Sequence, residues 1–449
     1  MITDFTFENR KSITAIQEQN FKAILDLCFE RHPYYRECFS NIGLKRSDIR
    51  SLADIYLIPI ISKKEYAANP EAFTLETDGL ANEANVKWDV MHTTGTSGGK
   101  PTPFVSTAYD FYSILTANRR ALEIRKIQET DLIANLCPMT LYPYGAYHRT
   151  IAAANVVKVP VISPLPGRPS DFFHWSASLD EVVSAIARSR ATILWGVTSY
   201  VRRILMRAEE ISADFSSVRL AFVTGESVSI EMRRDITERL QRVGKNDAWL
   251  SNSYAATEMQ VGAVECMPES GYHNPAPEQF YFEIVDPESH ESLSYGKRGL
   301  SVLTHLDRRG TVLLRYAMGD YAALSIDQCP SCGRWTDRFV GIPSRADDLI
   351  KVKGMLINPE VVIDLMLANG AINEFQIIVD KENSEDMLSS DRFRLLIDPS
   401  PDADLRGLAE TVRKAIGLRP IIEITPRHKI FDPEKSLKAK RLLDLRNAP

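Results

Sequence analysis

Glycine, hydroxyl and lysine residues are concentrated in residues 93–102 of the chain, TTGTSGGKPT. Glycine lets the backbone approach an anion closely, hydroxyls and amides donate to its oxygens, and Lys100 supplies positive charge. The segment therefore predicts a triphosphate-binding loop. It does not fit the GxxxxGK[ST] pattern of Walker-type NTPases because Pro101 follows the lysine, and an ordinary polar turn is the alternative. The candidate phosphate-binding residues are Thr93, Thr94, Gly95, Thr96, Ser97, Gly98 and Lys100.

A second group of residues has the types and spacing of a metal site. Cys329 and Cys332 form a CxxC motif, and Cys266 and His273 lie upstream with six residues between them. Three thiolates and one imidazole would complete a tetrahedral Zn²⁺ site with no open position, which is typical of structural zinc. A redox-active pair and unbound reduced thiols are the alternative interpretations.

The apolar pattern predicts the elements that must position these residues. Short β-branched runs at 191–197 and 220–224 alternate with an amphipathic stretch at 230–243, which indicates an α/β fold with partly parallel strands. Apolar residues between 13 and 28 recur with helical spacing, and His32-Pro33 ends that helix. After residue 345 the pattern changes to a small α+β domain. There we expect strands at 375–379, 394–397 and 421–424 and helices at 359–369 and 405–416.

Composition excludes several classes of protein. A length of 449 residues favours more than one domain, and a net charge of −5 offers no cationic surplus for nucleic acid. The N-terminus has no secretory leader and no run is long enough to cross a membrane, so we expect a cytoplasmic protein. Six cysteines are too few for a disulfide scaffold in a chain of this length.

Four further motifs make the sequence recognisable. They are SYAATE at 253–258, YAMGD at 316–320, RADDLIKVKG at 345–354 and KAKR at 438–441. In order and spacing they resemble the core motifs of the adenylate-forming superfamily, and within it the phenylacetate–coenzyme A ligase family. The resemblance implies a multi-layer N-terminal ATP- and acid-binding domain at 1–346. It also implies a small mobile domain at 347–449, with a hinge near Asp347.

The resemblance assigns roles to residues of the first two motifs. Tyr254 would lie against the adenine, and Thr257 and Glu258 would lie near the phosphates, where Glu258 would help to hold Mg²⁺. Asp320 would accept hydrogen bonds from both ribose hydroxyls, a task that suits an ionised carboxylate. For Tyr254, Thr257 and Glu258 the alternative is a buried tyrosine with a helix-capping Thr-Glu pair. For Asp320 the alternative is an ordinary Gly-Asp turn.

It also assigns roles to residues nearer the domain boundary and the C-terminus. Gly225 and Glu226 resemble the segment at the adenine edge, although a simple turn between strand and helix explains them nearly as well. Arg345 would reach the ribose or the α-phosphate, and a surface ion pair is its alternative. Lys438 would stabilise the negative charge that develops at the α-phosphate and the substrate carboxylate.

The acid pocket is expected where the family has an aromatic segment, here LYPYGAYHRT at 141–150. Tyr144, Tyr147 and His148 could line an apolar slot for a planar acid, with Tyr200 facing them. Aromatic clusters of this kind are as often part of a core. No general base is required, because the carboxylate is already ionised at neutral pH.

The predicted reaction is ATP-dependent formation of an acyl-adenylate, followed by transfer to the thiol of coenzyme A, with an aromatic or arylacetic acid as substrate. Two departures from the family pattern are an added glycine at Gly98-Gly99 and the stretch 355–357, the second near the expected entrance for the thiol. A carrier protein or an amine therefore stays open as acceptor. A non-catalytic, zinc-stabilised binding protein is the third hypothesis, and a homodimer is also open.

Overall fold

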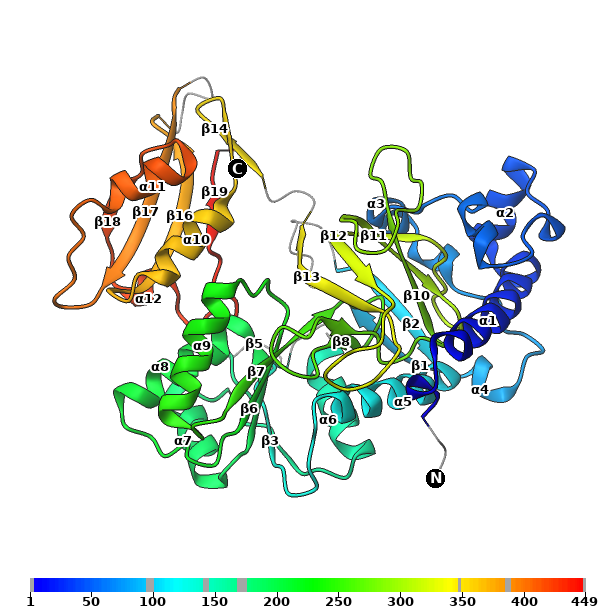
Figure 1. The fold of residues 1–449 in the computed structure, drawn as a ribbon, viewed down its shortest axis with the longest axis horizontal. Helices are drawn as coiled ribbons and strands as arrows, with labels where there is room; N and C mark the ends of the chain where they lie inside the picture. The colour runs from blue at the N-terminus through cyan, green and yellow to red at the C-terminus, as the bar shows by residue number, and fades with distance from the viewer. Residues whose placement is uncertain are drawn as a thin grey trace. The chain divides into compact units, whose positions relative to one another are not determined.

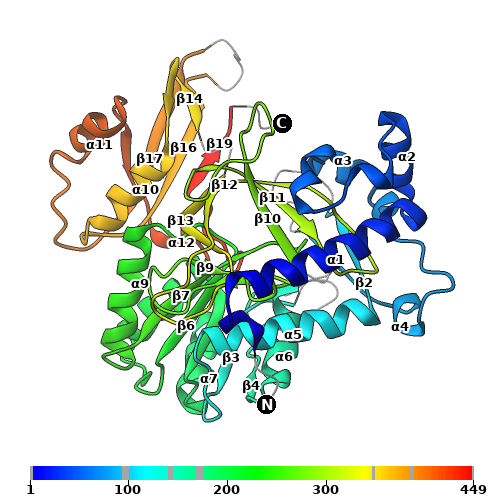
Figure 2. The ribbon, with the colours of Figure 1, turned by 45° about the vertical axis from the view of Figure 1, so that its right-hand side comes forward.

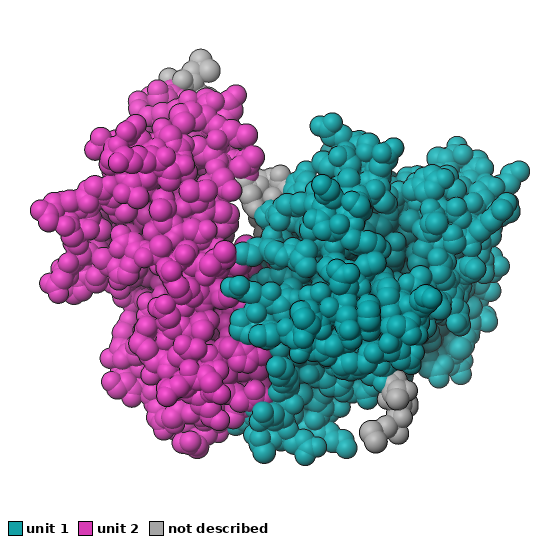
Figure 3. Space-filling view, viewed as in Figure 1, with its two compact units in different colours: residues 1–162, 222–225, 251–344 teal, residues 163–221, 226–250, 345–449 magenta. Residues whose placement is uncertain are grey.

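The computed structural model describes residues 4–93, 101–139, 145–167, 176–345, 349–383 and 389–446. The chain divides into two compact units (Figure 3). Unit 1 comprises residues 1–162, 222–225 and 251–344, and unit 2 comprises residues 163–221, 226–250 and 345–449. The predicted hinge residue, Asp347, lies outside the described residues.

Unit 1 contains the N-terminal helices and most of the strands (Figure 1). Its helices are α1 (Arg10–Arg31), α2 (Pro33–Ile42), α3 (Lys63–Ala68), α4 (Asn82–Asn85), α5 (Ala108–Ile124) and α6 (Gly145–Val156). Its strands are β1 (Lys87–His92), β2 (Pro103–Thr107), β3 (Ile133–Asn135), β4 (Val161–Ile162), β8 (Gly262–Val264), β9 (Tyr272–His273), β10 (Phe280–Val285), β11 (Gly299–His305), β12 (Tyr316–Ser325) and β13 (Arg338–Arg345).

Unit 2 contains the remaining helices and a second sheet. Its helices are α7 (Leu179–Ser189), α8 (Thr198–Glu210), α9 (Ile230–Val243), α10 (Pro359–Ala368), α11 (Leu408–Ile416) and α12 (Arg427–Ile430). Its strands are β5 (Ile193–Val197), β14 (Ile350–Val352), β15 (Met355–Ile357), β16 (Ile372–Lys381), β17 (Asp391–Pro399), β18 (Ile421–Ile424) and β19 (Leu442–Asp444). Strands β6 (Leu220–Thr224) and β7 (Trp249–Ala255) have residues in both units, and Arg345, the last residue of β13, belongs to unit 2.

The described strands confirm the predicted α/β class. The largest sheet has eleven strands in the order β10-β11-β12-β13-β9-β8-β7-β6-β5-β3-β4. Strands β10, β11 and β12 are antiparallel, whereas β3 and β4 pair in parallel. The sheet is therefore mixed, as the alternation of strands and helices in the sequence predicted.

Helix α1 confirms the predicted N-terminal helix and shows why it ends. Phe21, Ile24 and Leu25 are buried on one face of α1 in the core of unit 1, each contributing about 1.5–3 kcal/mol of burial free energy. His32 ends α1 and caps α2, whose first residue is Pro33, because its Nδ1 accepts from the backbone N–H of Tyr35 at 3.3 Å. In the same unit, α5 packs beside α6 (Figure 2).

The C-terminal sheet, ordered β18-β17-β16-β19, has a different partner on each face. Phe375, Ile377 and Val379 of β16 belong to a core cluster with residues of α10 and α11. Ile378 of β16 packs instead with Ile430 of α12. Because side chains alternate along a strand, one strand supplies both cores. The predicted small α+β arrangement of elements is confirmed (Figure 1).

Candidate active site

The described residues on either side of the predicted phosphate loop belong to two paired strands in unit 1. Strands β1 and β2 are antiparallel, with His92 paired to Pro103. The backbone N–H of Thr93 donates to the carbonyl of Thr102 at 3.0 Å, and the N–H of Thr102 donates to Oγ1 of Thr93 at 3.0 Å. These bonds close the base of the loop. The other candidates, Thr94, Gly95, Thr96, Ser97, Gly98 and Lys100, lie outside the described residues.

Tyr254 and Asp320 come from different motifs and meet in unit 1. Tyr254 is on β7 and Asp320 is on β12, and the tyrosine hydroxyl donates to Oδ2 of Asp320 at 2.9 Å. The Tyr254 ring packs edge-on against Phe339 with 4.8 Å between centroids. Burial, together with the negative charge of Asp320, raises the pKa of Tyr254 well above its ordinary value, so the phenol keeps its proton.

Glu258, the predicted magnesium ligand, is 7% exposed. Its Oε1 accepts from the hydroxyl of Tyr316 at 2.8 Å. Nε2 of His305, at the end of β11, lies 3.1 Å from the backbone carbonyl of Glu258. This contact fixes the backbone at Glu258. Thr257, the adjacent candidate, is half-buried. Tyr316 is the first residue of the YAMGD motif, but the motif does not predict its contact with Glu258.

A buried polar group beside this segment was not predicted. Arg149 of α6 donates through Nη2 to Oδ2 of Asp89 on β1 at 2.7 Å. It also donates to Oε1 of Gln260, which accepts from Oγ of Ser106 on β2 at 3.0 Å. These bonds tie both strands of the phosphate-loop hairpin to the residues that follow Glu258. The four side chains are scattered through the sequence, so no local pattern connects them.

In unit 2, Glu226 and Lys438 are electrostatic neighbours. The backbone N–H and the hydroxyl of Ser199, in the first turn of α8, donate to the two carboxylate oxygens of Glu226 at 2.7 and 2.9 Å. Burial raises the pKa of Glu226, and the positive charge of Lys438 opposes the shift. Burial lowers the pKa of Lys438, and Glu226 opposes it. Gly225 precedes with φ of +83°, in the left-handed region that glycine tolerates.

The other predicted residues are placed as follows. Arg345 is the last residue of β13, and its side chain is not described. Tyr147 is half-buried and His148 exposed on α6, with their rings edge to face at 5.5 Å. Tyr200 is 1% exposed on α8, and burial raises its pKa. Tyr144 lies outside the described residues. The pocket role of these aromatic residues stays a prediction.

The four predicted zinc ligands lie together in unit 1. The potential ligand atoms of Cys266, His273, Cys329 and Cys332 are all within 4.8 Å of one another. The sulfur atoms of Cys266 and Cys329 are 3.8 Å apart, and Sγ of Cys332 is 3.6 Å from Nε2 of His273. Nδ1 of His273 is 3.1 Å from Oγ1 of Thr336, a contact that orients the ring. Three sulfurs and one imidazole fit tetrahedral Zn²⁺.

No helix among the described residues combines the length and apolar character that a membrane crossing requires.

No family model matches the chain. A phenylacetate-coenzyme A ligase of Thermus thermophilus is 26% identical over 461 residues, covering 97% of this chain and 97% of that protein. A phenylacetate-coenzyme A ligase of Escherichia coli is 23% identical over 448 residues, covering 97% and 95% of the two proteins.

Solved structures show the same fold. A 2-hydroxyisobutyryl-CoA ligase in complex with 2-HIB-AMP gives a TM-score of 0.77 at 22% identity, covering 97% of this chain and 90% of that chain. The resemblance predicted from the motifs is therefore confirmed: the chain has the fold of adenylate-forming CoA ligases and is similar along almost its whole length to phenylacetate-coenzyme A ligases.

Proposed function

We propose that the protein activates a small carboxylic acid with ATP and transfers the acyl group to the thiol of coenzyme A. The observation that carries the proposal is the hydrogen bond between Tyr254 and Asp320 in a chain similar over 97% of its length to a phenylacetate-coenzyme A ligase. The bond places a flat aromatic ring beside a carboxylate, the pair of groups suited to an adenine and a ribose.

The first step joins the acid to the nucleotide. The ionised carboxylate attacks the α-phosphorus of ATP, an oxygen–phosphorus bond forms, and the bond to the leaving pyrophosphate breaks. Lys438 supplies positive charge where negative charge accumulates. Its half-buried position strengthens this effect, because charges interact more strongly away from bulk water. The product is an acyl-adenylate.

The second step releases the acyl group. The thiol sulfur of coenzyme A attacks the acyl carbonyl, the bond to the adenylate oxygen breaks, and AMP leaves while the thiol proton passes to solvent. Adenylation needs no general base, because a carboxylic acid with an ordinary pKa of about 4 is ionised at neutral pH.

Two metal ions belong to the proposal. A Mg²⁺ bound with ATP would neutralise phosphate charge, and the carboxylate of Glu258 has the oxygen donors that this ion prefers. A Zn²⁺ held by Cys266, His273, Cys329 and Cys332 would tie β9 to the loop that carries the CxxC motif, as a structural ion does.

The favoured substrates are aromatic or arylacetic acids, and the similarity of the chain to phenylacetate-coenzyme A ligases supports that class. The test is a pyrophosphate-release screen over aromatic and aliphatic acids, with and without coenzyme A. We expect release with aromatic acids and multiple turnovers only when coenzyme A is present. Turnover with a carrier protein but not with coenzyme A would show that the acceptor is the carrier protein. If no acid causes pyrophosphate release, the proposal is overturned.

A further inference from the structure

Glu374, near the start of β16, is part of a buried charged network in unit 2. It is 1% exposed and interacts with two arginines that are distant in the sequence. Nη1 of Arg202, on α8, lies 3.5 Å from its Oε2, and Nη1 of Arg441 donates to its Oε1. A carboxylate with so little contact with water requires such partners.

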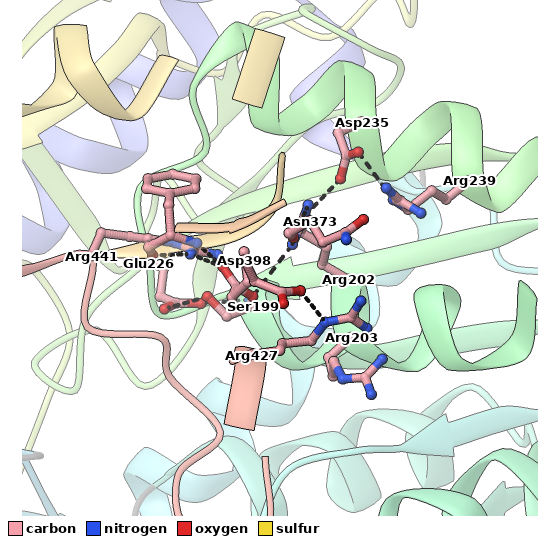
Figure 4. A network of polar contacts seen from close by, with 12 residues as sticks. Ser199, Arg202, Arg203, Glu226, Asp235, Arg239, Asn373, Asp398, Arg427 and Arg441 are labelled. Carbon is pink, nitrogen blue, oxygen red and sulfur yellow. Dashed lines mark hydrogen bonds and ion pairs between the residues drawn. The ribbon is translucent and has the colours of Figure 1, made fainter. Parts of the chain in front are cut away.

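Arg202 links Glu374 to the helices of the same unit. It is 3% exposed, and its Nε donates to Oδ2 of Asp235 on α9 at 2.7 Å. Both of its terminal nitrogens donate to the backbone carbonyl of Asn373 at 3.2 Å (Figure 4). One side chain therefore holds α8, α9 and the start of β16 together.

A second ion pair joins α8 to the C-terminal segment. Nη1 of Arg427, on α12, donates to Oε1 of Glu210 at the end of α8 at 2.5 Å. Its Nε donates to Oδ2 of Asp398 on β17 at 3.1 Å. This pair is more exposed than Glu374 and Arg202, so solvent screens it more strongly. The contact at Glu374 is therefore the more shielded from solvent of the two.

The network reaches Lys438 through Arg441, three residues later. The Arg441 carbonyl accepts from the backbone N–H of Ile377 at 2.8 Å, and its guanidinium lies 4.5 Å from the centroid of the Phe375 ring. The neighbouring carbonyl of Lys440 accepts from Nε2 of Gln376 at 2.7 Å. The chain after Lys438 is thus fixed to β16, and β16 is fixed to α8 by Glu374.

The same helix holds the acidic neighbour of Lys438. Ser199 of α8 binds both oxygens of Glu226, and Arg202 lies three residues further along α8. Residues three apart lie on one side of a helix. One face of α8 therefore contacts two carboxylates. Ser199 binds Glu226, the neighbour of Lys438, and Arg202 binds Glu374, which anchors the segment that carries Lys438.

We propose that Glu374, through Arg202 and Arg441, is a positioning residue that holds Lys438 for the adenylation step. This inference rests on the proposed function, in which Lys438 acts in the first half-reaction only. Loss of the Glu374 contact should therefore slow adenylation and spare thioester formation, because the second step does not use the Lys438 ammonium.

The test compares the two half-reactions in Glu374→Gln. Adenylation is followed by pyrophosphate release from acid and Mg·ATP, and thioester formation is started from synthetic acyl-adenylate and coenzyme A. We expect adenylation to fall at least about 10-fold, since small misplacements of a catalytic group cost up to about 100-fold. Thioester formation should stay within about 2-fold of wild type, because the second step does not depend on the position of Lys438.

Two further variants keep the result interpretable. Arg394→Gln removes an arginine that pairs with Asp380 and Glu423 within the C-terminal sheet, away from α8, and should leave both rates unchanged. Arg202→Lys keeps the charge but loses the planar fork, so it should give a smaller and still selective loss. If Glu374→Gln does not fold, Arg202→Lys carries the test.

An equal loss in both half-reactions, or no loss in adenylation, would overturn the inference. Failure of the proposed function is a different result, because the wild-type protein itself would then release no pyrophosphate with any acid.

Discussion

The hydroxyl of Tyr254 and the carboxylate of Asp320 are joined by a 2.9 Å hydrogen bond, although they are 66 positions apart in the sequence. Strands β7 and β12 bring them together in unit 1. The bond uses one carboxylate oxygen and orients the tyrosine ring. In the proposed function this pair recognises the nucleoside of ATP.

Asp320→Ala tests that recognition. Hydrogen bonds to a charged group contribute about 1.5–3 kcal/mol each, so losing them should lower kcat/KM for ATP at least about 10-fold, mainly through KM. Tyr254→Phe keeps the ring and removes only its hydroxyl, so its loss should be smaller. Steady-state kinetics with ATP as the varied substrate measures both. An unchanged KM in Asp320→Ala would exclude the ribose role.

Lys438→Ala tests the charge at the reacting phosphate. Removal of one group that stabilises transition-state charge costs about 100- to 1000-fold, so pyrophosphate release should be abolished within the sensitivity of most assays. ATP binding, measured by calorimetry, should persist. Lys440→Ala is the matched control, because Lys440 is an exposed lysine two residues away. Pyrophosphate release at the wild-type rate from Lys438→Ala would rule out the assignment.

The cysteine and histidine cluster predicts about one zinc per chain after chelator-free purification, because four ligands complete a closed site. Cys332→Ser should lower the metal content towards zero and reduce the thermal unfolding temperature. Cys38→Ser, which changes a cysteine outside the cluster, should keep the metal. Elemental analysis of the purified proteins measures the zinc content. A metal-free wild-type protein would show that the cluster is not a zinc site.

Buried His32 predicts a loss of stability in mild acid. Burial lowers its pKa to about 4 from an ordinary value of 6.5. Between those pH values the unfolded chain binds the proton and the folded chain does not, so the free energy of unfolding falls as pH falls from 6.5 to 4. The loss is on the order of 3 kcal/mol by proton linkage and is complete below pH 4.

Urea unfolding at several pH values, compared between wild type and His32→Gln, isolates this contribution. The variant cannot titrate at this position, so its unfolding free energy should fall less steeply over the same pH range. Identical pH dependence in the two proteins would show that His32 does not cause it.

Local sequence patterns predicted the helices and strands well and their ends less well. The expected helix at 405–416 begins at Leu408, because Gly407 with φ of +81° precedes it in the left-handed region. The expected strand at 375–379 is part of β16, which extends from Ile372 to Lys381. The added residues include polar ones at both ends, and pairing with β17 rather than apolar periodicity defines their strand conformation.

The motifs predicted the candidate site residues but not what supports them. Tyr254, Asp320 and Glu258 stand in recognisable motifs, and so does Lys438. The bonds of Arg149 to Asp89 and of Glu374 to Arg202 join residues far apart in the chain, and no local periodicity indicates them. Such contacts follow from the tertiary fold, which the spacing of apolar residues constrains only in outline.

Acid labelled with ¹⁸O in both carboxylate oxygens tests the central claim most directly. If the carboxylate attacks the α-phosphorus, one labelled oxygen stays with AMP after coenzyme A takes the acyl group. Mass spectrometry of the nucleotide product should therefore detect AMP that carries one ¹⁸O per turnover, together with unlabelled pyrophosphate. Unlabelled nucleotide, or ADP and phosphate in place of AMP and pyrophosphate, would contradict the acyl-adenylate.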